Sequence, residues 1–120
     1  MMTQYAFHCP SCGAHLNRNE KIVLKTRRSN GDEGEIEMST SVGNYEYQHN
    51  PDVLFSPGEI VDFICTSCNA ELNSKEFENY ALLNLKVAEN IVFDVLFSRQ
   101  AGVQKTYLVT EDGIETYSGN

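Results

Sequence analysis

The most constraining feature of this sequence is a short cysteine motif that occurs twice. Residues 7–17 read FHCPSCGAHLN and residues 63–73 read FICTSCNAELN, and seven of these eleven positions are identical. A repeat of only two copies cannot build a solenoid, which needs at least three stacked units. The duplication therefore predicts one local structure, a cysteine-bearing turn or knuckle, that is used twice.

The spacing of the cysteines favours a metal site. Each motif contains a Cys-x-x-Cys pair, and the four residues are Cys9, Cys12, Cys65 and Cys68. Two such pairs complete the tetrahedral four-sulfur shell that Zn²⁺ favours. The residue after each pair is Gly13 or Asn69, and these residue types tolerate the left-handed backbone that such turns often need. We therefore expect one zinc ion per chain.

Three alternatives to a zinc site remain open in the sequence. A tetrahedron of four sulfurs also suits iron, and the segment from Cys9 to Gly13 matches the CPxCG pattern of rubredoxin-like knuckles, whereas that from Cys65 to Asn69 does not. The other two are buried thiol pairs without an ion and a disulfide within each pair. Disulfides are disfavoured because thioredoxin-like chemistry accompanies a βαβ pattern, and this chain offers little helix.

The paired motifs resemble those of the zinc-ribbon class, in which two Cys-x-x-Cys knuckles at the ends of β-hairpins share one ion. The whole chain is also similar to small bacterial proteins that contain zinc ribbons, a resemblance that implies no activity. Compact ribbons have a shorter separation between the two pairs. The resemblance therefore implies that an extra strand or hairpin is inserted between Cys12 and Cys65.

Alternation of apolar and polar residues predicts β-strands along most of the chain. Between the knuckles the expected strands are Lys21–Thr26, Glu35–Thr40 and Glu59–Ile64. The first two are joined as a hairpin by a segment that contains Asn30-Gly31, a strong turn signal. Residues 81–117 alternate with short turns, which predicts an antiparallel β-meander. Ser74–Tyr80 is the one candidate for a short helix, with Ser74 as its cap.

These patterns together predict an all-β fold, with a zinc-ribbon-like knuckle pair, an inserted β-hairpin and a C-terminal meander. The 120 residues are enough for one domain, with the knuckle pair and inserted strands in residues 1–75 and the meander in residues 76–120. Aromatic side chains at alternating strand positions are expected to pack in the core, with a partner surface as the alternative: Tyr45, Tyr47, Phe93, Phe97, Tyr107 and Tyr117.

Charge and hydropathy argue against several classes of partner. The chain has 9 Lys and Arg against 17 Asp and Glu, a net charge of −8, so it has no overall positive field to attract nucleic acid. No stretch approaches the roughly 18 apolar residues that span a bilayer, and no secretory signal precedes Cys9. We expect a cytoplasmic protein, where spaced cysteine pairs more often bind a metal than form disulfides.

No catalytic motif accompanies the cysteines. The sequence lacks the G-x-S-x-G, P-loop, G-x-G-x-x-G and H-E-x-x-H patterns, and a four-thiolate shell has no open position for substrate or water. His8, His15 and His49 are therefore expected at surface or packing positions. We expect a non-catalytic, zinc-stabilised module that binds another protein, or that self-associates through edge strands. The alternative is an iron-binding, rubredoxin-like electron-transfer protein.

A second alternative rests on the hairpin between the knuckles. Residues 26–34 read TRRSNGDEG and resemble the acidic tip of transcript-cleavage-factor zinc ribbons, which reaches into RNA polymerase. The resemblance implies that Asp32 and Glu33 help to hold a catalytic Mg²⁺ of the polymerase and that Arg28 contacts phosphate. The other interpretation is a solvated turn beside a solvated basic edge, formed by Lys25, Arg27 and Arg28.

Overall fold

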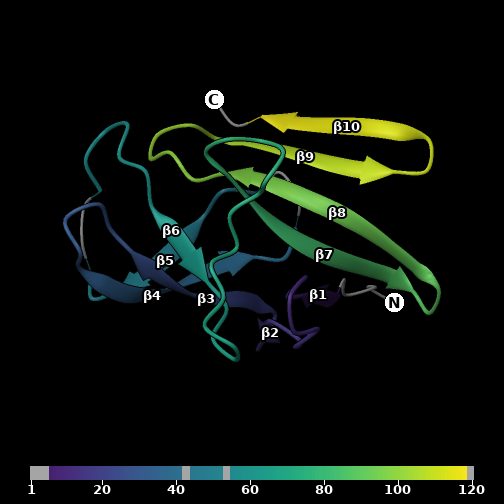
Figure 1. Cartoon of the computed structure of the whole chain (residues 1–120), viewed down its shortest axis with the longest axis horizontal. Helices are drawn as coiled ribbons and strands as arrows, with labels where there is room; N and C mark the ends of the chain where they lie inside the picture. Colours follow the sequence, from purple (N-terminus) through teal and green to yellow (C-terminus); the bar gives the residue numbers. More distant parts are fainter. Residues whose placement is uncertain (1–5, 42–43, 53–54, 119–120) are drawn as a thin grey trace.

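The computed structural model describes residues 6–41, 44–52 and 55–118. Within these ranges the chain forms ten β-strands and no helix, so none of them contains a helix that could cross a membrane. The strands are β1 (Ala6–His8), β2 (Asn17–Arg18), β3 (Lys21–Arg27), β4 (Glu33–Ser39), β5 (Tyr47–Asn50), β6 (Asp62–Ile64), β7 (Tyr80–Ala88), β8 (Ile91–Ser98), β9 (Lys105–Thr110) and β10 (Gly113–Ser118). The predicted all-β fold is confirmed (Figure 1).

The strands form two antiparallel sheets. The first sheet has the order β1-β7-β8-β9-β10, and the second has the order β2-β3-β4-β5, with β6 also pairing with β3. β2 pairs with the start of β3, whereas β6 pairs with residues 25–27 at its end. Because β4 pairs along the whole length of β3, β2 and β6 follow one another along the opposite edge.

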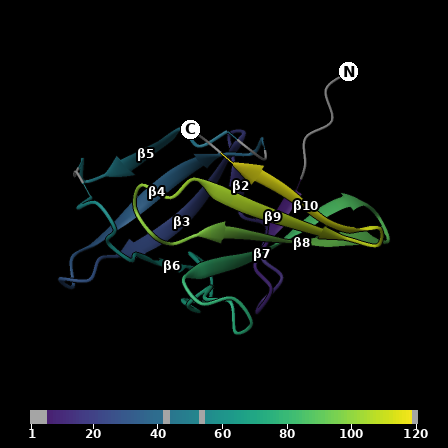
Figure 2. The same ribbon diagram turned by 90° about the horizontal axis from the view of Figure 1, so that it is seen from above.

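The two sheets share one apolar core. Alternate positions of β7 are buried because every second side chain of a strand points to the same face. In β3, Val23 is buried together with its neighbours Ile22 and Leu24. The core cluster joins residues of the second sheet, including Ile22, Leu24 and Ile36, with residues of the first, including Leu83, Leu85 and Val95. Figure 2 shows β3, β4 and β5 on the left and β7 to β10 on the right of the molecule.

The predicted hairpin and the predicted meander are confirmed. β3 and β4 pair in register, and the N–H of Arg28 donates to the Asp32 carbonyl at 2.8 Å to close the turn between them. β7, β8, β9 and β10 pair in chain order, with Val95 between Leu83 and Leu108. The signals for both elements are local, which explains why the sequence reveals them.

The predicted helix at Ser74–Tyr80 is wrong. Ser74 Oγ accepts hydrogen bonds from the N–H groups of Glu76 and Phe77, at 3.2 and 3.1 Å, as a helix cap would. Asn79 then has a φ of 66°, outside the helical range, and the Ser74 N–H donates to the Tyr80 carbonyl at 2.8 Å. The segment therefore closes into a loop that leads directly into β7.

Two features of the central segment differ from the sequence prediction. The expected strand Glu59–Ile64 begins only at Asp62. Before it, Ile60 forms an isolated bridge with Gln100, which lies in the loop between β8 and β9. β5 is an additional strand on the edge of β4. Tyr47 at its start is 51% exposed and so is not a core residue, whereas Phe93, Phe97 and Tyr117 pack against the core as predicted.

Candidate metal centre

Each knuckle carries the chain from one sheet to the other. The first knuckle, residues 9–16, leaves β1 of the first sheet and leads to β2 of the second. The second knuckle, residues 65–72, leaves β6 of the second sheet and leads back to β7 of the first. Because β1 pairs with β7, and β2 and β6 share one edge of β3, the two knuckles meet at the junction of the sheets.

The two knuckles have the same backbone hydrogen bonds. The N–H of the first cysteine donates to the carbonyl of the alanine five positions later, at 3.0 Å in both copies. The residue after the second cysteine donates its N–H back to the first cysteine's carbonyl, at 2.9 Å from Gly13 and 3.0 Å from Asn69. These residues have φ values of 78° and 62°, the left-handed conformation that their types predict.

The four cysteines form one compact cluster. Their Sγ atoms all lie within 4.8 Å of one another. Between the knuckles, Sγ of Cys9 lies 3.9 Å from that of Cys68, and Sγ of Cys12 lies 3.8 Å from that of Cys65. Sulfurs that surround a zinc ion tetrahedrally at about 2.3 Å lie about 3.8 Å apart. The cluster can therefore hold one metal ion, and its geometry suits zinc and iron alike.

Backbone N–H groups stabilise negative charge on the two buried sulfurs. Cys9 and Cys65 are buried, whereas Cys12 and Cys68 are exposed. Sγ of Cys9 accepts from the N–H groups of Ser11 and Cys12 at 3.3 and 3.4 Å. The matching bonds to Sγ of Cys65, from the corresponding serine and cysteine, are 3.3 and 3.5 Å. These contacts supply the outer hydrogen-bond shell that metal-bound thiolates commonly have.

The two buried thiols, Cys9 and Cys65, ionise at different pH. Burial raises the pKa of the Cys9 thiol to about 12. Burial also opposes ionisation of Cys65, but there the N–H donors of Cys68 and Ser67 outweigh it and lower the pKa to about 7. The first thiolate therefore forms near neutral pH, and its charge opposes formation of the next. A bound cation removes this opposition because it stabilises all four thiolates together.

Lys25 and Arg27 of β3 are partly exposed but paired with other side chains, so they do not form the free basic edge that was predicted. Lys25 Nζ donates to Oδ1 of Asn69 in the second knuckle. Arg27 donates to Asp62 of β6 at 2.8 Å and also to Glu71 of the second knuckle. These contacts lie across the pairing of β3 with β6. They fasten the second knuckle to the central strand of its sheet.

The tip of the β3–β4 hairpin is an exposed turn. Among the described residues, Asp32 belongs to no group with metal-ligand spacing. Its N–H donates to Asn30 Oδ1 at 2.9 Å. Glu33 is exposed at the first position of β4. Arg28, for which the resemblance implies a phosphate contact, instead donates to both Glu59 carboxylate oxygens at 3.0 and 2.9 Å. Its guanidinium is thus occupied inside the fold.

The three histidines lie outside the sulfur cluster. The rings of His8 and His15 lie 5.2 Å apart beside the first knuckle. His49 is a packing residue of β5, because its Nε2 lies 2.6 Å from Thr26 Oγ1 and its Nδ1 lies 2.7 Å from the Pro51 carbonyl. Its ring also meets that of Phe55 edge to face. Among the described residues, the cysteines are the one group with metal-ligand spacing.

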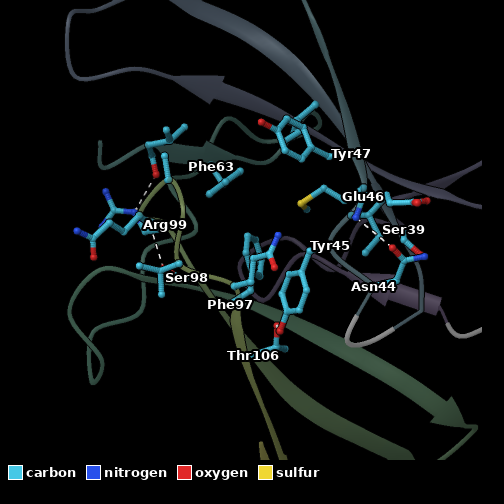
Figure 3. A pocket seen from close by; sticks show the side chains of 18 of the residues that line it. Ser39, Asn44, Tyr45, Glu46, Tyr47, Phe63, Phe97, Ser98, Arg99 and Thr106 are labelled. Carbon is cyan, nitrogen blue, oxygen red and sulfur yellow. Dashed lines mark hydrogen bonds between the residues drawn. The ribbon is translucent and has the colours of Figure 1, made fainter. Parts of the chain in front are cut away.

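Sequence reasoning missed an apolar cavity of about 390 Å³ between the two sheets (Figure 3). The aromatic residues Tyr45, Tyr47 and Phe97 line it, and their alternation in the sequence indicated core packing or a partner surface, not a cavity. Whether two sheets meet closely or leave a space depends on contacts between residues far apart in the chain. The sequence pattern therefore does not distinguish a filled core from a core with a cavity between the sheets.

The comparisons with known proteins do not assign the chain to a family. It matches no protein-family model, and it has no significant match among curated proteins or among solved structures.

Proposed function

We propose that this protein is a non-catalytic, zinc-stabilised interaction module of the zinc-ribbon type. The observation that carries the proposal is the spacing of the four sulfurs, which is that of a tetrahedral shell, in knuckles that each join the two sheets. Four thiolates fill the shell, so no position remains for substrate or water. The ion then acts as a cross-link, and the function lies in the surfaces that it holds together.

The partner that fits this proposal is another protein with a basic surface. The chain has a net charge of −8, and the basic residues Arg27, Arg28 and Arg99 are already paired with carboxylates. The last strand, β10, is a sheet edge on which Ile114 is 60% exposed. Such an edge can add a strand from a partner or from a second copy. Binding is expected in the cytoplasm, where thiols stay reduced.

The first test is the metal content of the purified protein. We expect a colourless protein with one zinc per chain, measured by inductively coupled plasma mass spectrometry. We also expect the Cys12→Ser variant to lose the ion, while the Ser11→Ala variant of the same turn keeps it. A coloured protein with one iron per chain would overturn the zinc assignment.

Iron remains the second candidate because two of the four sulfurs are exposed. Cys12 and Cys68 reach the surface, and an exposed thiolate edge would allow electron exchange with a redox partner. Material from the native source decides between the metals, since expression conditions influence loading. Visible absorbance that bleaches reversibly on reduction supports the electron-transfer protein, and its absence with bound zinc excludes it.

The second test is capture of the partner at two salt concentrations. Immobilised zinc-loaded protein is expected to retain a basic protein at low salt and to release much of it at high salt, because screening weakens attraction between exposed charges. Sedimentation of the protein alone reveals self-association through the β10 edge. Retention that does not change with salt would contradict the electrostatic part of the proposal.

A further inference from the structure

The cavity between the sheets has deep apolar walls. Buried side chains from both sheets line it: Phe7, Ile22, Ile36, Val61, Phe63, Leu83 and Val95, each 7% exposed or less. The partly buried Met38 and Phe97 complete these walls. Its volume of about 390 Å³ lies in the range of small-molecule pockets.

Polar groups join the lining from two connections between strands. One segment leads from β4 to β5 and includes Ser41, Asn44 and Glu46. The other connects β8 to β9 and includes Gly102 and Gln104. Mostly apolar walls with a small number of polar groups are typical of sites that bind small organic molecules.

Tyr45 forms a bridge over the cavity from one sheet to the other. Its hydroxyl group lies 3.0 Å from Thr106 Oγ1 of β9 (Figure 3). It also donates to the Tyr117 carbonyl of β10 at 3.0 Å. Thr106 is 5% exposed, so these bonds are sheltered from water. Because the hydroxyl is occupied by these partners, the aromatic ring is the part of Tyr45 available to a ligand.

The charges around the cavity disfavour an anionic occupant. Its described lining contains two charged side chains, Arg99 and Glu46. Arg99 is satisfied within the fold, because its Nε donates to the Val61 carbonyl at 3.1 Å and its guanidinium pairs with Asp62. Lys21 lines a separate hollow where Glu37 and Glu46 oppose its charge. The lining thus offers no unpaired cation to an anionic group.

Size and lining together define the ligand class. A cavity of roughly 150 Å³ holds benzene, so about 390 Å³ has room for two or three rings. Aromatic side chains around the space can meet such rings in offset or edge-to-face geometry: Tyr45, Tyr47, Phe55, Phe63 and Phe97. We propose that this cavity binds a small neutral aromatic molecule, held between the two sheets.

The test uses two probes that differ in one charged group. Zinc-loaded full-length protein is titrated with N-phenyl-1-naphthylamine, which is neutral, and with 1-anilinonaphthalene-8-sulfonate, which has the same rings and a sulfonate. We expect saturable binding of one neutral probe per chain, with a fluorescence increase and a blue shift. The sulfonate is expected to bind at least tenfold more weakly. No saturable binding of the neutral probe, or equal affinity of both, would overturn the proposal.

A matched pair of variants locates the probe. Met38→Trp adds bulk to the cavity wall, whereas Val92→Trp adds a similar bulk at a 54% exposed position of the β7–β8 hairpin. We expect at least a tenfold loss of affinity in the first variant and no change in the second. Equal loss in both variants would mean that the probe binds elsewhere, and the proposal would fail.

Methyl NMR of the wild-type protein keeps the test decisive even if Met38→Trp does not fold. The methyl groups of Leu83 and Val95 face the cavity, whereas Leu96 is buried on the other face of the first sheet. Addition of the neutral probe is expected to shift the resonances of Leu83 and Val95 and to leave that of Leu96 unchanged. The opposite pattern would contradict the proposal.

Discussion

At the scale of single residues, the buried charges of this protein are matched by close partners. The side chains of Arg28 and Glu59 are 15% and 5% exposed and form a two-pronged ion pair. The ring of Phe55 lies 5.4 Å from the Arg28 guanidinium, which adds a cation–π contact. The guanidinium hydrogen bonds lower the pKa of the Glu59 carboxyl group to about 2. This pair ties the base of the β3–β4 hairpin to the segment that leads into β6.

The Glu59→Gln variant tests this pair through its dependence on pH. Because the folded pKa lies below the ordinary 4.5, the carboxylate stabilises the fold above pH 4.5 and loses this effect as pH falls towards 2. We expect the variant to lose about 2 kcal/mol of unfolding free energy at pH 7, as for a hydrogen bond to a charged group. The loss should shrink progressively below pH 4.5. Urea unfolding over this pH range measures it.

The control for this prediction is Glu89→Gln, at an exposed position of the β7–β8 turn. Loss of any bound metal in acid would affect wild type and variants equally, so the difference between them isolates the carboxyl group. A Glu59→Gln deficit that stays constant from neutral pH to pH 2 would mean that the variant acts through packing rather than charge.

At the scale of elements, features with local signals could be predicted from the sequence and those with distant partners could not. Asn30-Gly31 marks its hairpin, and the spacing of the cysteines marks both knuckles, because the residues that determine these turns are neighbours in the chain. The partners of Lys25 and Arg27 lie on another strand, so the sequence could not reveal that both side chains are paired. Ser74 accepts a capping hydrogen bond from Phe77 as predicted, but the segment forms a loop instead of a helix. The Ser74 N–H closes this loop by donating to the Tyr80 carbonyl at the start of β7.

The duplicated knuckle predicts which substitutions its turn accepts. A Cβ on Gly13 would meet no atom within 4 Å, so the cost of substitution is the strain of its positive φ alone. Asn69 occupies the matching position of the second knuckle with a similar φ. We expect Gly13→Asn to cost less than about 1 kcal/mol and Gly13→Val about 2 kcal/mol, because a β-branched residue resists this conformation. Urea unfolding of the zinc-loaded variants measures both, and equal losses would contradict the explanation.

At the scale of the whole molecule, the sulfur cluster and the cavity lie in one assembly of two sheets. The knuckles connect the sheets at one junction, and the Tyr45 bridge connects them again at the cavity. Between these two connections lies the shared apolar core. Neither the cluster of sulfurs nor the cavity exists within one sheet. Their arrangement follows from long-range pairing, which is why the local pattern predicts the metal ligands but not the cavity.

Removal of the metal is expected to loosen the junction before it loosens the meander. Without a cation, the sulfur cluster cannot hold four thiolates together, whereas the ladder of β7, β8 and β9 keeps its hydrogen bonds and its buried Leu96 and Leu108. After chelation, hydrogen exchange measured by mass spectrometry should increase most in residues 6–18 and 62–73 and least in β8 and β9. The Cys12→Ser variant should reproduce this pattern without chelator, and Ser11→Ala should not. A uniform increase along the chain would mean that the ion supports the whole fold equally, and no increase would mean that the apolar core holds the sheets together without it.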